Sequence, residues 1–321
     1  MRAAALLLLL VLELAVFASV SGADVSTLPG VLGYLELKFL DLIPGLAPVL
    51  VLSVGMTLVL VTAGIDLSVG SMLALVAAVM SCCEGGAAFW FTAVPLGLLV
   101  GVGLGMFNGV LVSRLDIPPI VATLGTMIFY RGLCQVVMRD AERAPFFDVP
   151  GYEWLGGFSG SLIMLGLVAG AGGWFWSRSR WRRELLLVGG NRVAARYAGV
   201  PVDRRLVETY AVMGGLAWLA AMCFTARNGA VNASTATGLE LKVIVAVVLG
   251  GTRVEGGRGS LLGSVLGAFL GAVLDDGLRE AKGWSDEHLP FEVSHLRYLL
   301  LGLLLVSGVW LNTRVSRRDA G

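Results

Sequence analysis

Long apolar runs dominate the pattern of hydrophobic and polar positions along this chain. A membrane-spanning helix needs roughly 20 mostly apolar residues, and such runs recur along the sequence, separated by polar connections. They do not alternate apolar and polar residues as the strands of a membrane barrel do. Because backbone polar groups must be paired inside a bilayer, we expect helices. The runs predict ten spans, at residues 3–20, 46–63, 69–83, 88–112, 117–138, 159–176, 206–226, 239–251, 261–276 and 296–311.

This pattern predicts an all-α, polytopic integral membrane protein that forms a single transmembrane domain over residues 1–321. Glycine-rich breaks interrupt it near residues 64–71 and 250–260, and broken helices of this kind can shape a transport path. The first run has features of a signal peptide, but its length favours an uncleaved span. We expect longer outer connections at residues 21–45, 139–158 and 276–295, the last as a solvated acidic loop.

Composition agrees with this fold class. Hydrophobic residues make up 56% of the chain and charged residues 15%, whereas a soluble domain carries about 25% charged residues. The 44 glycines suit a membrane bundle, because small residues let helices approach closely. Gly97, Gly101, Gly105 and Gly109 predict one such packing ridge. A net charge of +1, four cysteines and two histidines predict no nucleic-acid partner, no disulfide framework, no cofactor and no metal site.

The basic residues are divided unevenly between the two sides of the expected membrane. With the N-terminus in the cytoplasm, 15 of the 24 lysines and arginines fall on the cytoplasmic side and six on the outer side. The positive-inside rule therefore predicts that both termini and the basic connection at residues 177–205 are cytoplasmic.

An acidic residue, Asp66, stands in the first break, within residues 55–71. An ionisable residue at membrane depth is a functional hypothesis by default. The alternative, which we favour, is a helix cap in which Asp66 or Ser68 binds free amide groups at the start of the third span.

A second segment, residues 189–200, lies in the basic cytoplasmic connection. Ala194, Ala195 and Ala198, followed by Gly199 as a helix terminator, predict a short helix with one close-packing face. The alternative is a plain connection whose arginines only orient the chain.

Together these segments resemble the ribose-type sugar permeases of ATP-binding-cassette importers. Residues 55–71 match that family's Gly-Met-Thr and Gly-Ile-Asp-Leu-Ser-Val-Gly-Ser pattern. The resemblance spans about residues 45–310 and departs at Asp275-Asp276-Gly277, where relatives often carry Asn-Asn-Gly. It implies a sugar substrate, but no particular sugar. Its further matches, in order, are Asn108-Gly109, residues 118–126, residues 191–199, Glu240-Leu241 and residues 249–260.

The resemblance implies the permease subunit of an ATP-driven importer in the bacterial inner membrane, moving a monosaccharide inward by alternating access. The implied partners are cytoplasmic ATP-binding subunits, an outer substrate-binding protein and a second permease chain. The chain carries no phosphate-loop motif, so we expect ATP hydrolysis in a partner and no enzyme activity here. Two alternatives stay open: a permease of the related branched-chain amino-acid importers, and an ion-coupled secondary transporter.

The resemblance also assigns two sets of residues. The first set is expected to couple the chain to the ATP-binding subunits: Gly190, Asn191, Ala194, Ala195 and Gly199. The second is expected at the helix break or along the pathway: Gly64, Asp66, Ser68, Gly70, Asn108, Thr123, Thr126 and Glu240.

Overall fold

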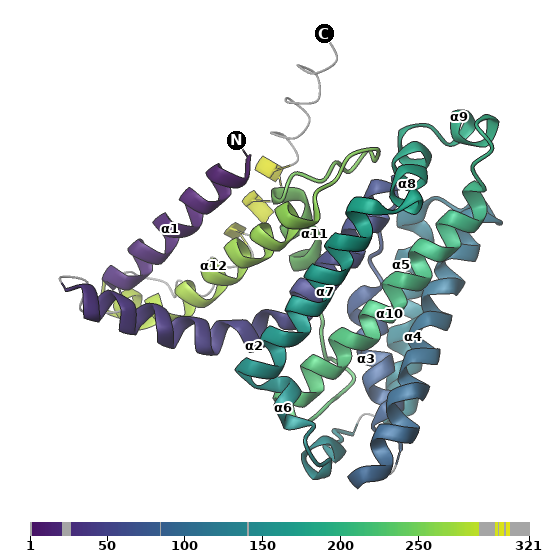
Figure 1. Cartoon of the computed structure of the whole chain (residues 1–321). Helices are drawn as coiled ribbons and strands as arrows, with labels where there is room; N and C mark the ends of the chain where they lie inside the picture. The colour runs from purple at the N-terminus through teal and green to yellow at the C-terminus, as the bar shows by residue number, and fades with distance from the viewer. Residues whose placement is uncertain are drawn as a thin grey trace.

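The computed structural model describes residues 2–20, 27–83, 85–139, 141–288 and, between 299 and 308, all but 301 and 305. These residues form helices joined by short connections (Figure 1). Within the described ranges, extended backbone pairs only at one bridge between Arg143 and Val231. The all-α fold class is confirmed.

The named elements follow the chain from Arg2 to His288. They are α1 (Arg2–Val20), α2 (Leu28–Val61), α3 (Val69–Met80), η1 (Gly86–Ala88), α4 (Phe89–Ser113), α5 (Pro119–Met138), η2 (Pro145–Asp148), α6 (Glu153–Gly156), α7 (Phe158–Arg178), α8 (Arg180–Gly190), α9 (Arg192–Tyr197), α10 (Val202–Asn228), α11 (Leu239–Leu249) and α12 (Leu261–His288).

Of the helices in the described part of the chain, six are long and apolar enough to cross a membrane. Apart from the last, each of the ten predicted spans overlaps a helix. However, α3 has 12 residues and α11 has 11, which at 1.5 Å per residue is too short to cross a core of about 30 Å alone. Half of the tenth predicted span, at residues 296–311, lies outside the described residues; its described residues have helical backbone but belong to no named helix.

The expected outer connection at residues 21–45 is wrong from residue 28 onward, because α2 begins there. Thr27 caps the helix by accepting a hydrogen bond from the N–H of Gly30 at 3.2 Å. Pro44 and Pro48 lie inside α2, and an interior proline removes a backbone hydrogen bond and kinks a helix. Figure 1 shows α2 bending, so that its N-terminal part reaches away from the bundle towards α1.

The expected acidic loop at residues 276–295 is also wrong up to residue 288, because α12 continues through it. Two of its acidic residues, Asp276 and Glu280, are paired rather than simply solvated. Lys38 of α2 lies 2.6 Å from Asp276 and 2.5 Å from Glu280, and Lys242 of α11 lies 2.8 Å from Asp275. Residues 289–295 lie outside the described residues.

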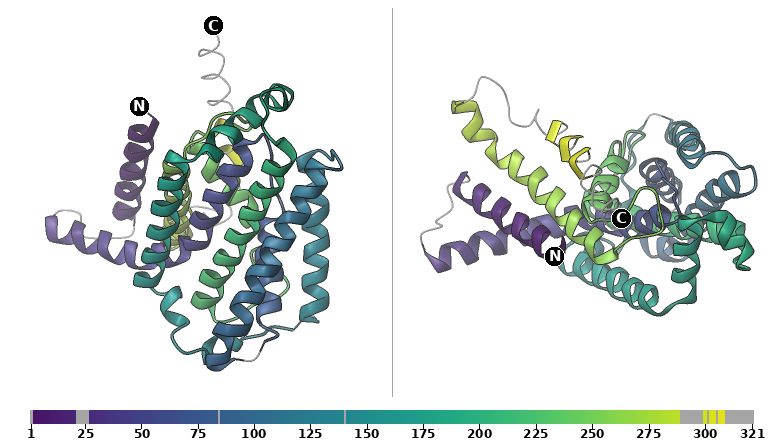
Figure 2. Two further views of the ribbon diagram at one scale, coloured as in Figure 1. Left: turned by 45° about the vertical axis from the view of Figure 1, so that its right-hand side comes forward. Right: turned by 90° about the horizontal axis from the view of Figure 1, so that it is seen from above.

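The core forms where α2, α3, α4 and α10 pack together. The glycine ridge of α4 faces α10, as predicted: a Cβ atom added at Gly101 would lie 2.6 Å from the carbonyl oxygen of Gly214. On the other side of the molecule α1 lies beside α12 (Figure 2).

Candidate functional site

A buried polar network holds the break between α2 and α3. Oδ1 of Asp66 accepts hydrogen bonds from the N–H of Ser68 at 2.9 Å and from its hydroxyl at 2.6 Å. Nδ2 of Asn108, on α4, donates to the Ser68 hydroxyl at 2.8 Å and lies 3.5 Å from Oδ2 of Asp66. These three side chains are fully buried. The network therefore joins the break to α4.

Two residues of α5 extend this network. The hydroxyl of Tyr130 lies 3.1 Å from Oδ1 of Asn108 and 2.8 Å from the carbonyl oxygen of Leu104, so its single proton can serve either acceptor. The hydroxyl of Thr123 lies 3.0 Å from the carbonyl oxygen of Ile65, inside the break. The break is thus bonded to α5 as well as to α4.

The remaining break residues are tightly packed. A Cβ atom at Gly64 would lie 2.8 Å from the Tyr210 hydroxyl, and one at Gly70 would lie 2.6 Å from the carbonyl oxygen of Ala236. Thr126 bonds back to the carbonyl oxygen of Thr123, one turn earlier in its own helix, at 3.2 Å.

Seven of the eight predicted break or pathway residues therefore gather in and around one buried cluster. Asp66 binds the N–H of Ser68, the residue that precedes α3, and the Ser68 side chain makes no cap of its own. Glu240 lies at the edge of this cluster, because a Cβ atom at Gly70 would lie 2.5 Å from its Oε2. It also lines a cavity of about 680 Å³ together with Arg131 and Gln135 of α5. The sequence did not single out these two α5 residues, although an arginine within an apolar span was a usable signal.

The short helix α9 has well-defined ends. Oδ1 of Asn191 accepts hydrogen bonds from the N–H groups of Val193 at 2.9 Å and Ala194 at 3.0 Å. At the other end, Gly199 takes the left-handed conformation with φ +79°. The N–H groups of Gly199 and Val200 bond to the carbonyls of the last turn, both at 3.0 Å, which is a Schellman ending. The predicted short helix is confirmed, and Gly190 is the exposed last residue of α8 before it.

Ala195 does not face outward, contrary to the expectation drawn from its small side chain. It is 1% exposed and packs against Val188, Val202 and Leu206. Its size lets α9 lie close to α8 and α10. The exposed apolar side chains of α9 are Val193, 60% exposed, and Tyr197, 90% exposed. Sequence reasoning missed this pair, although a spacing of four residues places both on one helix face.

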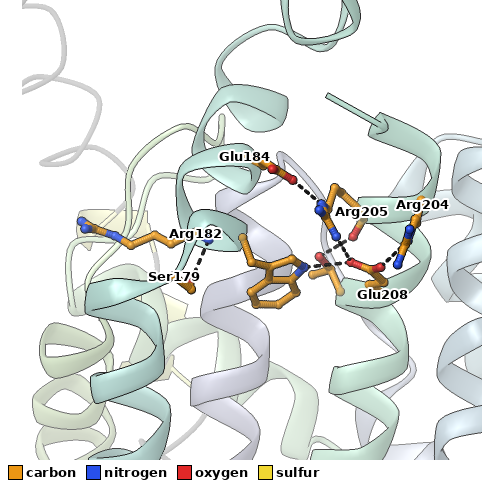
Figure 3. A network of polar contacts seen from close by, with 8 residues as sticks. Ser179, Arg182, Glu184, Arg204, Arg205 and Glu208 are labelled. Atoms are coloured by element: carbon orange, nitrogen blue, oxygen red, sulfur yellow. Dashed lines mark hydrogen bonds and ion pairs between the residues drawn. The ribbon is translucent and has the colours of Figure 1, made fainter. Parts of the chain in front are cut away.

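Ion pairs fix α8 to the start of α10 (Figure 3). Arg205 pairs with Glu184 of α8 and lies 2.6 Å from Glu208. Glu208 also accepts hydrogen bonds from Trp181 at 3.0 Å and from Arg204 at 2.7 Å. These contacts make α8 and the start of α10 one unit.

A separate ion pair ties α9 to α10. Arg196 lies 2.7 Å from Asp203, and this hydrogen bond raises the pKa of the Arg196 guanidinium above its ordinary value. Both side chains are about half exposed, so the pair contributes little to stability. It helps to orient α9.

The C-terminal end of α8 meets the end of α2 and the loop at residues 250–260. The carbonyl oxygen of Val61 accepts a hydrogen bond from the N–H of Gly257 at 2.9 Å. A Cβ atom at Gly189 would lie 2.7 Å from that same nitrogen. Gly257 itself has φ +72°, which favours glycine. The three segments singled out in the sequence therefore meet at one junction, formed by Gly189, Val61 and Gly257.

Comparisons with known proteins agree with this arrangement of segments. A family model described as "Branched-chain amino acid transport system / permease component" matches residues 40–308. The ribose import permease protein of Escherichia coli (strain K12) is 34% identical over 235 residues, which cover 71% of this chain and 73% of that protein. The autoinducer 2 import system permease protein of Klebsiella pneumoniae is 35% identical over 272 residues, which cover 80% of this chain and 74% of that protein. No solved structure matches the chain.

The sequence motifs indicated a resemblance to ribose-type permeases, and this resemblance is confirmed. The family model covers most of the chain and both relatives exceed 30% identity. The chain therefore belongs to the family of transport-system permease components that includes the ribose and autoinducer 2 import permeases.

Proposed function

We propose that this chain is the membrane-spanning subunit of an ATP-binding-cassette importer for a monosaccharide-class solute, located in a bacterial inner membrane with both termini in the cytoplasm. The observation that carries the proposal is the 34% identity with a ribose import permease over 71% of this chain. Six long apolar helices are consistent with a multi-pass membrane protein.

In this proposal, cytoplasmic ATP-binding subunits dock on α9. Asn191 and Gly199 define the ends of this helix, Ala195 seats it on its own chain, and Val193 and Tyr197 offer an exposed apolar surface. Gly190 leaves space where α8 ends, because no atom lies within 4 Å of a Cβ added there. Hydrolysis of ATP takes place in those partners, so this chain performs no chemistry.

A movement of α9 has a contiguous route into the membrane. Contacts fix α9 to α8 and α10, and α8 meets α2 at Gly189 and Val61. The end of α2 leads within a few residues to the network of Asp66. Chains of packed and hydrogen-bonded elements are the usual carriers of energetic coupling. We propose that movement along this route shifts the equilibrium between two packings of the helices. This shift would expose the pathway alternately to the two sides of the membrane.

Two further partners belong to the proposal. A substrate-binding protein delivers the solute at the outer side, and a second permease chain supplies the other half of the pathway. A branched-chain amino acid is the second candidate solute, because the description of the matching family names that class.

Reconstitution tests the proposal. The permease, its ATP-binding subunits and its binding protein are placed in proteoliposomes and offered radiolabelled ribose, other pentoses, hexoses, and the amino acids leucine, isoleucine and valine. We expect ATP-dependent accumulation of a sugar, lost when the ATP-binding subunits are omitted. Accumulation of leucine without any sugar would support the second candidate. Uptake driven by an ion gradient without ATP would refute both.

A further inference from the structure

A cavity of about 680 Å³, with both polar and apolar residues in its wall, lies between α5, the loop at residues 229–238 and the start of α11. This volume is within the range of about 300–1,000 Å³ that is usual for small-molecule sites. Its polar lining residues are Arg131, Gln135, Asn232, Ser234, Thr237 and Glu240.

The position of Arg131 indicates what this cavity faces. It belongs to α5, a helix long and apolar enough to span a membrane, whose exposed side chains outside the cavity include Val121, Phe129 and Val136, which are 59%, 55% and 73% exposed. A charged residue within a span is costly in lipid and almost always faces a bundle interior or a water-filled cavity. We therefore expect the wall around Arg131 and Gln135 to face water rather than acyl chains. In the proposed importer, the second permease chain would supply the opposite wall.

The cavity wall is held in shape by its own hydrogen bonds. Nη1 of Arg131 donates to the carbonyl oxygens of Ala233 at 2.8 Å and Thr235 at 2.7 Å, which fixes the loop against α5. Within the loop, Oδ1 of Asn232 accepts from the N–H of Ser234 at 3.0 Å and from its hydroxyl at 2.8 Å. A site that is organised before binding avoids the entropic cost of ordering it.

The chemistry of the lining selects an uncharged, hydroxyl-rich ligand. Arg131 and Glu240 carry opposite charges, so the two cancel across the cavity. Gln135 offers amide donors and an acceptor, and Ser234 and Thr237 add hydroxyl oxygens. A sugar hydroxyl both donates and accepts, which suits this mixture. Nη1 of Arg131 is engaged by two backbone carbonyls, which leaves its Nη2 and Nε groups as donors for a sugar hydroxyl.

A second large cavity in the described part of the chain does not offer this chemistry. It measures about 570 Å³, lies between α2, α7 and α10, and is walled mainly by leucine, valine and tryptophan side chains. An apolar hollow on a membrane-spanning surface suits lipid acyl chains better than a sugar.

We infer that the cavity around Arg131, Gln135 and Glu240 is a binding site for an uncharged sugar in the half of the pathway that adjoins η2 and α6. The assignment rests on the proposed function and adds the residues that contact the solute. Gln135 is the residue that tests it best, because its side chain is exposed and its replacement leaves the core intact.

The test uses the complete reconstituted importer and the sugar that the wild-type complex accumulates. Gln135→Leu and the similarly long Gln135→Met should lower kcat/KM for uptake roughly 3- to 10-fold, the usual effect of one lost hydrogen bond. Glu240→Gln keeps an acceptor oxygen and should lower it less than about threefold. Val136→Leu, at an exposed neighbour outside the cavity, is the matched control and should be unchanged. Membrane level and co-purified ATP-binding subunits are measured for every variant.

The outcomes separate the two proposals. If the wild-type complex accumulates no sugar, the proposed function fails. If it accumulates a sugar and the three cavity variants all match it, this site assignment is overturned and the proposed function stands. If Glu240→Gln abolishes uptake while both Gln135 variants are normal, uptake requires the negative charge of Glu240. The assignment to an uncharged sugar is then wrong.

Discussion

The carboxylate of Asp66 accepts two hydrogen bonds from Ser68 at the helix break, and we expect these bonds rather than its charge to be what transport requires. Asp66→Ala would leave the buried N–H of Ser68 without its acceptor, at a cost of about 1–3 kcal/mol. Asp66→Asn keeps the Oδ1 acceptor for both Ser68 bonds and alters only the longer 3.5 Å contact with Asn108. We expect the alanine variant to unfold at lower temperature in detergent and to transport poorly, and the asparagine variant to retain much of both properties. Equal damage in the two variants, at normal membrane levels, would mean that the charge itself is required.

Two adjacent glycines at the end of α8 provide a matched pair of substitutions. A Cβ atom at Gly189 would press on the backbone of Val61 and Gly257, whereas one at Gly190 has no atom within 4 Å. Gly189→Ala should therefore separate α8 from α2 and lower both stability and transport. Gly190→Ala should leave the free energy of unfolding unchanged or raise it by up to about 1 kcal/mol, because alanine is the better helix former. Thermal unfolding and uptake in proteoliposomes measure the difference. Identical behaviour of the two variants would contradict the close contact between α8 and α2.

At the scale of elements, the docking surface that we propose on α9 consists of the exposed side chains of Tyr197 and Val193. Tyr197→Ala removes the most exposed side chain of this helix and touches nothing in the core. We expect normal membrane levels, at least a roughly fivefold loss of co-purified ATP-binding subunits, and a matching loss of transport, since buried aromatic anchors dominate interfaces. Phe91→Ala, at an 84% exposed position at the start of α4, is the control and should bind the subunits normally.

Ala195→Trp has a different expected outcome. Because Ala195 is enclosed by Val188, Val202 and Leu206, a tryptophan there would lift α9 from its own chain. Loss of coupling in that variant should therefore come with a lower melting temperature, unlike in Tyr197→Ala. A variant with normal stability and no coupling would show that Ala195 meets a partner after all.

At the scale of the whole molecule, α9 and the η2–α6 segment lie at opposite ends of the bundle (Figure 1). The charge bias predicts that the α8–α9 end is cytoplasmic. In a background without native cysteines, Arg183→Cys should resist an impermeant thiol reagent in intact cells and react in inside-out vesicles. Glu142→Cys, at an exposed position near η2, should behave in the opposite way. Labelling of position 183 in intact cells would overturn this orientation.

The sequence by itself determined the fold class, the order of the motifs and the family. Apolar runs of bilayer length leave few structures other than helices. Asn191 caps the start of α9 with its side chain, and Gly199 ends the helix in the left-handed conformation that glycine favours. These signals depend on residues close together in the chain, and such signals can be read without a structure.

Only the tertiary structure decided which residues face one another. Residues 28–45 and 276–288 carry charges that interrupt their apolar residues, yet both lie in helices, and Lys38 of the first pairs with Asp276 of the second, 238 positions away. The spacing of small residues in α9 could not show that Ala195 turns inward, because Val202 and Leu206 of α10 enclose it. Arg131 reaches the loop of Ala233 from 102 positions away, and so creates a cavity wall. In each case the partner residue is distant in the chain. A local pattern of hydrophobic and polar residues contains no information about which distant group will pair with a charge or bury a side chain.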